Sequence, residues 1–515
     1  MTTACPRCGF PETAPKIAAV WPTSLSPELR RSNTAPLESQ SIEFIQQMGV
    51  ATTAISEIED KMQDLQRALD DLVVQQQALL NFVAEHQKVL ATVRTLPNEL
   101  LVEIFLRCAD RDSSCEWNPD IDPEWVLGRV CSRWRTVALS TPQIWSRIFI
   151  SNGPFWQQFE SRGLSVKPNF SRQMERSAEA PLTITFDVET HFPDEVAENM
   201  LTLLLSAAHR WQQANICLMR PGGRLLQPIS ATSFPQLRAL FLKHGYSRNL
   251  QSTSNPCAIF QSAPLLEDLG FSGHSYNHRP WPLARIHVFP LSQIQRLTLK
   301  QYQYQISEFL DVIRSANDIV ELSVEQWLER GEDPNASLDY TPVTLASLRT
   351  LSLVDAETSF LRFMVVPAVQ HLTLDLMDYS LNEIAEFLPY TQSSLTRLTL
   401  ITRPIHSAER LLQALNLTPG ITHLTLVGGF RLDSGFIRAL SCGPGERNLV
   451  PGVVTLEIGG SSYCDRASFF NMLKSRCAPG PLRSVTLRGW LNNLSDPLEF
   501  EALRQDHGLN IHLNP

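Results

Sequence analysis

Two hydrophobic patterns dominate the chain, and the first predicts one long helix. Over residues 55–93, apolar side chains recur at alternating spacings of three and four, with Gln76 and His86 as the polar exceptions. This spacing is the heptad pattern of a helix that has an apolar seam. No Gly or Pro interrupts it, so we predict a coiled-coil-like helix over residues 51–94. The seam must be covered, either by a second copy in a homodimer through residues 55–93 or by the chain folding back on itself.

The second pattern predicts short parallel strands. The template L-x-x-L-x-L occurs ten times between residues 181 and 515, at intervals of 21 to 32 residues. Alternate residues of a strand point to one face, and helical faces such as that of Phe309, Leu310 and Ile313 lie between the templates. One such unit cannot bury its own apolar edge, but stacked neighbours can. The ten templates begin at Leu237, Leu266, Ile294, Ile319, Leu348, Val369, Leu395, Ile421, Val453 and Leu482.

The period and the template resemble leucine-rich repeats. The resemblance implies an α/β fold in which a leucine-rich-repeat solenoid with a parallel sheet covers residues 181–515. The asparagine ladder of the extracellular type is absent, which favours the intracellular, helix-backed kind of repeat. The alternative is an ordinary α/β domain with leucine-rich strands, and ten near-evenly spaced copies fit it less well.

The residues between the inward leucines are expected on the concave face of the sheet. The central position is Thr or Ser in seven of the ten repeats, which suits an exposed strand. The preceding position varies more and forms a mildly cationic row on an acidic protein, made of Arg296, Glu321, His371, Arg397 and His423. Such a row is either a solvated sheet face or a substrate-binding strip for an acidic or phosphorylated partner.

Residues 95–150 predict a small all-α module. Leu96-Pro97 marks a helix start, because proline fixes φ and needs no amide partner in a first turn. Thr141-Pro142 stops the second of two predicted helices. The module has more large apolar side chains than a core of its size can bury, which indicates a docking face for another protein. The two helical faces consist of Leu100, Leu101, Ile104 and Phe105, and of Val130, Trp134, Val137 and Ala138.

The same residues resemble an F-box. The variable gap of the family pattern corresponds to Asp110–Trp125, which is longer and more acidic than usual. The sequence is also similar to F-box proteins of mushroom-forming fungi, in which a coiled segment precedes the box. The matching elements are Leu96-Pro97, Glu99-Leu100, Ile104-Phe105, Val130-Cys131-Ser132-Arg133-Trp134 and Ile144-Trp145.

The resemblance implies the substrate-recognition subunit of an SCF-type cullin-RING ubiquitin ligase, which is not itself an enzyme. The F-box would dock the Skp-type adaptor of the cullin complex, and the repeats would hold an unknown protein substrate. Alternatives are a helical hairpin that packs only on its own chain, an F-box scaffold without substrate ubiquitination, and a small-molecule-sensing receptor with a deep polar pocket. Some residues of the adaptor-binding pattern will belong to the core of the module and others will contact the adaptor, and the sequence does not separate the two groups. The residues that match the pattern are Leu96, Pro97, Leu100, Ile104, Val130, Trp134 and Trp145.

Composition and motifs narrow the classes of function. A net charge of −9 disfavours binding to nucleic acid or to acidic membrane surfaces. No apolar run reaches the ~20 residues of a membrane span, and no signal peptide opens the chain, so a cytoplasmic or nuclear location is expected. The phosphate-loop, dinucleotide-binding, zinc-protease and hydrolase motifs do not occur, so we expect no enzymatic activity and no cofactor.

The remaining segments carry weaker patterns. Residues 1–50 lack periodicity, which predicts a disordered tail, and residues 151–180 are expected to form a connecting loop. Cys5 and Cys8 look like half of a zinc ribbon, but no second Cys-x-x-Cys pair occurs. No metal site is therefore expected.

Overall fold

The computed structural model divides the chain into two compact units, Met1–Pro97 and Asn98–Pro515. Cys5, Cys8 and most of the acidic gap after Asp110 lie outside the described residues. The structure describes residues 27–31, 35–110, 122–151, 167–187, 194–217, 233–243, 256–273, 283–301, 303–329, 341–356, 358–376, 381–391, 394–402, 408–428, 434–443, 448–459, 466–477, 480–488 and 497–514.

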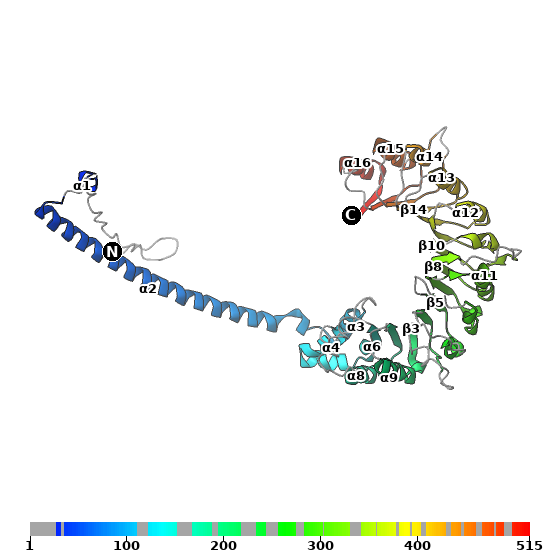
Figure 1. Ribbon diagram of the computed structural model, residues 1–515, viewed down its shortest axis with the longest axis horizontal. Helices are drawn as coiled ribbons and strands as arrows, with labels where there is room; N and C mark the ends of the chain where they lie inside the picture. The colour runs from blue at the N-terminus through cyan, green and yellow to red at the C-terminus, as the bar shows by residue number, and fades with distance from the viewer. Residues whose placement is uncertain are drawn as a thin grey trace. The chain divides into compact units, whose positions relative to one another are not determined.

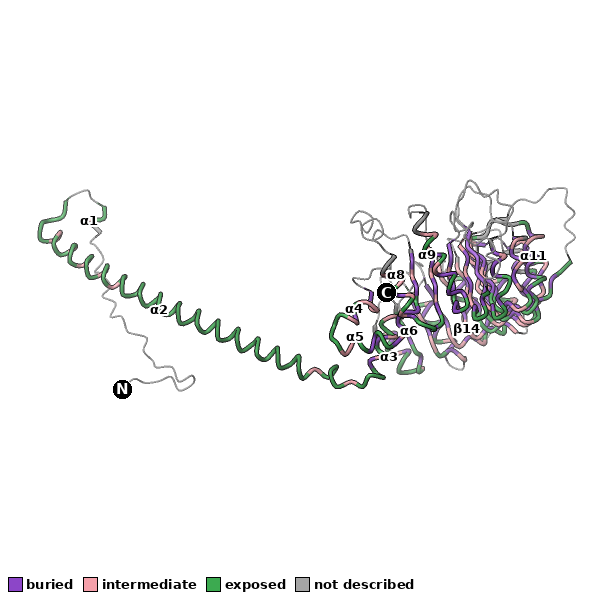
Figure 2. Tube along the Cα trace, turned by 90° about the horizontal axis from the view of Figure 1, so that it is seen from below, coloured by how far each residue is buried: buried purple, intermediate pink, exposed green. Residues whose placement is uncertain are grey.

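In the first unit, one helix of 53 residues, α2 (Glu38–Leu90), carries the heptad seam. It follows the short helix α1 (Pro27–Arg31) and precedes a 3-10 turn, η1 (Thr92–Arg94). The predicted long helix is confirmed, but its start and the disorder predicted for residues 38–50 are wrong. No residue of α2 is buried, as Figure 2 shows along its length.

The earlier start of α2 has local causes. The Gln40 side chain accepts a hydrogen bond from the backbone N–H of Leu37 at 3.0 Å. Glu38 lies in the first turn, where the helix dipole favours an acidic side chain. Met48 extends the apolar spacing by one heptad. Gly49 does not end the helix, because a glycine in a helix interior costs only about 1 kcal/mol.

The second unit opens with four helices that we call the helical module. Pro123 and Pro142 each lie in a first helical turn, where proline fits. The second apolar face, predicted as one helix, is split at Cys131, whose backbone is extended and whose Sγ accepts a hydrogen bond from the Trp134 amide at 3.4 Å. The four helices are α3 (Asn98–Ala109), α4 (Pro123–Val130), α5 (Ser132–Leu139) and α6 (Pro142–Trp145).

The helical module leads directly into a parallel sheet that has fifteen strands in the described residues, and fourteen of them follow one another in chain order. Its first strand, β1 (Arg147–Ser151), places Arg147 opposite Thr183 of the second. The sheet therefore begins inside the segment expected to close the helical module, and not at residue 181. All ten predicted strands are present. The others in the path are β2 (Leu182–Asp187), β3 (Trp211–Cys217), β4 (Ala239–Lys243), β5 (Asp268–Ser272), β6 (Arg296–Lys300), β8 (Glu321–Glu329), β10 (Thr350–Ala356), β12 (His371–Leu376), β13 (Arg397–Thr402), β14 (His423–Gly428), β15 (Thr455–Gly459), β16 (Ser484–Arg488) and β17 (Asn510–Asn514).

Short strands and helices complete the second unit. Strand β7 (Gln303–Tyr304) pairs with β8, and β9 (Val343–Thr344) pairs with β11 (Met364–Val365). Figure 1 shows the strands on the concave side of this unit and the helices on the opposite side. The helices are α8 (Lys167–Arg176), α9 (Asp194–Ser206), α11 (Ile306–Ser315), α12 (Leu381–Phe387), α13 (Ala408–Asn416), α14 (Ser434–Leu440), α15 (Arg466–Cys477) and α16 (Pro497–His507). The 3-10 turns are η2 (Ala208–Arg210), η3 (Pro256–Ser262), η4 (Leu283–Val288), η5 (Leu291–Gln293), η6 (Ser359–Phe363) and η7 (Leu388–Tyr390).

The connecting loop predicted for residues 151–180 is wrong in part, because α8 lies within it and Ser151 belongs to β1. Phe170 of α8 is buried, and Gln173 Nε2 donates a hydrogen bond to the Arg147 carbonyl at 2.8 Å. Helix α8 therefore packs on the start of the sheet. Its sequence is mostly polar and gives little apolar periodicity, so the pattern did not predict it.

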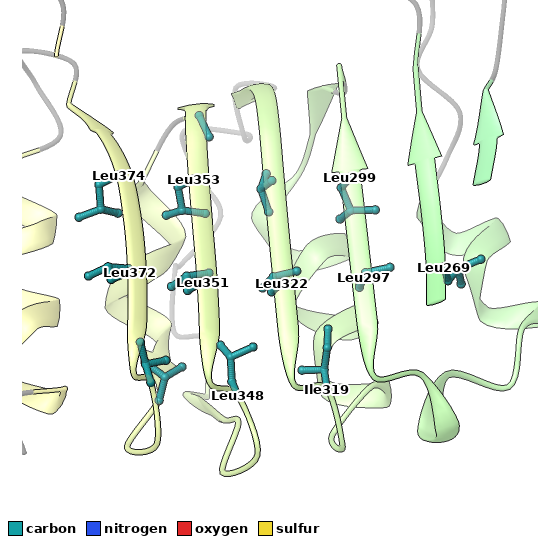
Figure 3. Close-up of a cluster of buried hydrophobic side chains, with 14 of the residues drawn as sticks. Leu269, Leu297, Leu299, Ile319, Leu322, Leu348, Leu351, Leu353, Leu372 and Leu374 are labelled. Carbon is teal, nitrogen blue, oxygen red and sulfur yellow. The ribbon is translucent and has the colours of Figure 1, made fainter. Parts of the chain in front are cut away.

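The leucines of the templates form a continuous core between the sheet and the helices. Leu398 lies opposite Leu372 on one side and Leu424 on the other, and all three are buried. Figure 3 shows equivalent leucines from β6 to β12 in register across the sheet. The residues between them, such as Thr399, are half-buried on the concave face. The predicted alternation is confirmed in strands such as β6, β14 and β16, whereas in β5 Gly270 and Ser272 are buried as well.

Candidate protein-interaction surfaces

Helix α3 presents two apolar faces. Leu101 and Phe105 are completely buried and form its core side. Leu100 and Ile104, which precede them by one residue in each turn, are 51% and 41% exposed, and Val130 at the end of α4 is 56% exposed. The structure thus places these three predicted adaptor-binding residues on the surface, and we call them the apolar patch.

A hydrogen-bonded contact joins the starts of α3 and α5 near two residues of the apolar patch, Leu100 and Val130. Arg133 Nε and Nη2 donate to Asn98 Oδ1 at 3.1 and 2.9 Å, which joins the first turns of α5 and α3. Leu100 follows Asn98 by two residues and Val130 precedes Arg133 by three, so both lie near this contact. Val126 and Leu139 are also exposed and were not singled out in the sequence.

The two tryptophans of the pattern are core residues to different degrees. Trp145 is buried, its Nε1 donates to the Ala138 carbonyl at 2.8 Å, and its ring packs edge-on against Trp125. Trp134 is half-buried, with its ring 5.0 Å from that of Phe105. Burial removes Trp145 from the accessible adaptor-binding candidates. Its role in this structure is to hold α5 and α6 together.

Leu96 and Pro97 belong to the first unit and precede α3 directly. Leu96 is half-buried and Pro97 is exposed. The proline therefore lies at the entry to α3, as its position in the F-box-like pattern predicts.

The five residues of the predicted substrate-binding row share one row of the sheet. Arg296 lies opposite Glu321, His371 lies opposite Arg397, and Arg397 lies opposite His423. Thr350 of β10 stands between Glu321 and His371. Strand pairing brings these residues together although helices and 3-10 turns separate their strands in the chain.

The structure divides this row into a neutralised part and a cationic part. Arg296 Nε donates to Asp268 Oδ2 on β5 at 3.0 Å, and this hydrogen bond raises the pKa of Arg296. Glu321 on the following strand adds a second negative charge beside it. The charge of Arg296 is therefore largely balanced within the sheet.

We call the remaining residues, His371, Arg397 and His423, the cationic triad. Within the described part of the chain, Arg397 forms no ion pair. Burial of His423, followed by the charges of Arg397 and His371, lowers the pKa of the His423 imidazole. Among the residues that the structure describes, no carboxylate forms an ion pair with Arg397, so positive charge accumulates at the triad.

A hollow of about 650 Å³ lies where the helical module meets the first strands. Its floor is the concave face of β1 to β6, and Asp110, Asp122 and Glu124 of the helical module form one wall. Phe241 lies across the position of Gly270, where an added Cβ would come within 2.2 Å of the ring. The missing side chain at Gly270 therefore makes room for an aromatic floor.

The cations of the hollow are already paired. Arg147 Nη2 contacts Asp110 Oδ1 at 2.6 Å, and Lys300 Nζ contacts Glu325 Oε2 at 2.8 Å. Polar, uncharged groups such as Thr185 line much of the rest. The hollow is a polar cavity with a partly apolar floor.

Comparisons with known proteins add no family assignment, since no protein-family model matches the sequence and no curated protein matches it. In the described ranges, no helix is both long enough and apolar enough to cross a bilayer. The same ranges hold no cluster of three or more His, Cys, Asp or Glu side chains suited to a metal ion.

Proposed function

We propose that this chain is the substrate-recognition subunit of an SCF-type cullin-RING ubiquitin ligase. In this proposal the helical module is an F-box that docks the Skp-type adaptor, and the stacked strands are leucine-rich repeats that hold a protein substrate. The observation that supports it most is the apolar patch, because three large side chains at F-box positions remain outside the core of their own chain. Exposed apolar groups gathered on one surface are typical of protein-binding sites.

The mechanism is proximity. The chain would hold its substrate beside the ubiquitin-charged enzyme and so raise the effective concentration of the two reactants. On the concave face, the proposed substrate-binding surface is the cationic triad, because Arg296 at the other end of the predicted row is already paired with Asp268. A complex that assembles with cullin but ubiquitinates no bound partner would identify a scaffold instead.

Changing both Leu100 and Ile104 to aspartate should reduce binding to the Skp-type adaptor by at least about tenfold, because central apolar contacts carry most of the binding energy of an interface. Fold stability should change little, since both side chains are exposed. Titration of the labelled adaptor with the purified full chain measures the effect. The matched control is Leu498→Asp, another exposed leucine of the same unit. Undiminished binding by the double variant would reject the F-box assignment.

The hollow favours a second candidate, a repeat receptor that senses a small molecule. A polar cavity on the concave face is the feature that this function needs, and the hollow offers one of drug-sized volume. Substrate capture that is lost on dialysis and restored by the dialysed small molecules would support this candidate over direct protein recognition.

We also propose that the first unit forms a homodimer through residues 55–93. A helix of 53 residues without a buried side chain leaves its whole seam uncovered within that unit. The full wild-type chain should then sediment at twice its mass of 58.0 kDa. Leu65→Lys combined with Leu72→Lys should give monomers, because both leucines lie in the seam.

Val74→Lys is the control for the homodimer, because Val74 is exposed but lies outside the seam. This variant should remain dimeric. A wild-type chain that stays monomeric at all accessible concentrations would exclude the homodimer and favour packing of the seam on its own chain.

A further inference from the structure

The cationic triad lies on three adjacent hydrogen-bonded strands, β12, β13 and β14. Neighbouring strands are about 4.8 Å apart, so Arg397 lies between two histidines whose backbones are about 10 Å from each other. Thr373, Thr399 and Thr425 form the next row on the same face. An extended acidic segment that crosses the strands would place carboxylates along this row.

The surroundings do not neutralise the triad. On the neighbouring strands, Thr350 lies beside His371 and Thr455 lies beside His423. The nearest acid on β15, Glu457, is held by Arg488 of β16. Asp375, at the far end of β12, is buried. Elsewhere on the concave face, cations such as Lys300 pair with a carboxylate of the next strand.

The hydroxyl group of Thr422 lies beside the His423 ring. Thr422 Oγ1 donates to the Thr396 carbonyl at 3.1 Å and lies 2.9 Å from His423 Nδ1. When the Thr422 hydroxyl donates its single proton to the Thr396 carbonyl, His423 Nδ1 carries the ring hydrogen and donates it to Oγ1. Neutral His423 then has a bare Nε2, which cannot donate to an anion. Protonation of Nε2 turns it into a charged donor.

We infer that His371, Arg397 and His423 form an anion-binding site that takes up a proton when an acidic segment of a protein partner binds. The negative partner would offset the neighbouring cations that disfavour a charged His423, and it would accept the new Nε2–H bond. Binding should therefore tighten as the pH falls through the range in which histidine titrates. The inference rests on the proposed function only in identifying the partner as the captured substrate.

Fluorescence anisotropy with a labelled octa-aspartate peptide and the full chain tests this site at constant ionic strength. Between about pH 7.5 and about pH 5.5, affinity should rise by up to about tenfold per pH unit for each proton taken up, while aspartate side chains stay ionised. Arg397→Gln should weaken binding by at least about tenfold. His423→Gln should reduce the pH dependence but keep part of the affinity. An octa-asparagine peptide should not bind.

Arg296→Gln is the matched control, because it removes the same charge from the same row at a site already balanced by Asp268. It should leave the affinity nearly unchanged. Equal losses for Arg296→Gln and Arg397→Gln, or an affinity that does not rise on acidification, would overturn the inference. Adaptor binding through the apolar patch is measured separately, so failure of the F-box proposal leaves this result interpretable.

Discussion

Replacing Leu398 with aspartate should destabilise the second unit by about 4 kcal/mol or more. Leu398 is buried between Leu372 and Leu424, so a carboxylate there would have neither water nor a hydrogen-bond partner. Thr399→Asp is the matched control, one residue away on the concave face. It should cost less than about 1 kcal/mol, the range spanned by strand preferences.

Urea unfolding of both variants, followed by circular dichroism, measures this difference as a shift of the midpoint. Because each strand is stabilised by its neighbours, a defect in β13 should also broaden the transition. Equal midpoints for Leu398→Asp and Thr399→Asp would contradict the burial of Leu398.

Arg476→Lys should cost about 3 kcal/mol, because it leaves buried carbonyl groups without donors. Arg476 of α15 is buried and donates to three backbone carbonyls, at 3.1 Å to Val450, at 2.6 Å to Leu449, and also to Leu440. Lysine keeps the charge but has a single ammonium group, which cannot reproduce the planar fork of the guanidinium. Thermal unfolding of the full chain measures the loss.

Arg483→Lys provides the comparison for this variant. Arg483 is exposed and donates to the Gly480 carbonyl at 3.2 Å, so its replacement should change stability by no more than about 0.5 kcal/mol. A loss as small for Arg476→Lys would show that the three carbonyls find other partners.

The sheet could be predicted because the inward-facing residues of each strand are close together in the sequence and have a regular spacing. Leu351 and Leu353 alternate within β10, Leu348 lies just before that strand, and the same pattern recurs along the chain. Helix α8 could not be predicted, since Phe170 is one of few apolar residues in it and is buried by segments distant in sequence. Strand β1 was hidden because its residues directly follow the F-box-like pattern.

The sequence predicted which residues belong to the candidate sites. It did not predict which of their charges are neutralised by neighbours or which of their side chains are exposed. In sequence, Arg296 and Arg397 occupy equivalent positions. They differ because β5 places Asp268 beside Arg296, 28 residues away in the chain, whereas β12 places His371 beside Arg397. Likewise, Leu100 and Leu101 are adjacent and equally apolar, and only the packing of the helical module decides which one is exposed.

The pairing of β1 with β2 makes the helical module the end cap of the stacked array. Ile148 and Ile150 of β1 are part of the same buried core as Ile184 and Phe186 of β2. A variant that lacks the helical module and β1, and so begins after β1, would open that core. Its β2 would present unpaired backbone donors and acceptors at the sheet edge, where other chains could associate. Deletion of the helical module would therefore also disturb folding, whereas a point substitution such as Leu100→Asp tests the proposed adaptor binding without opening the core.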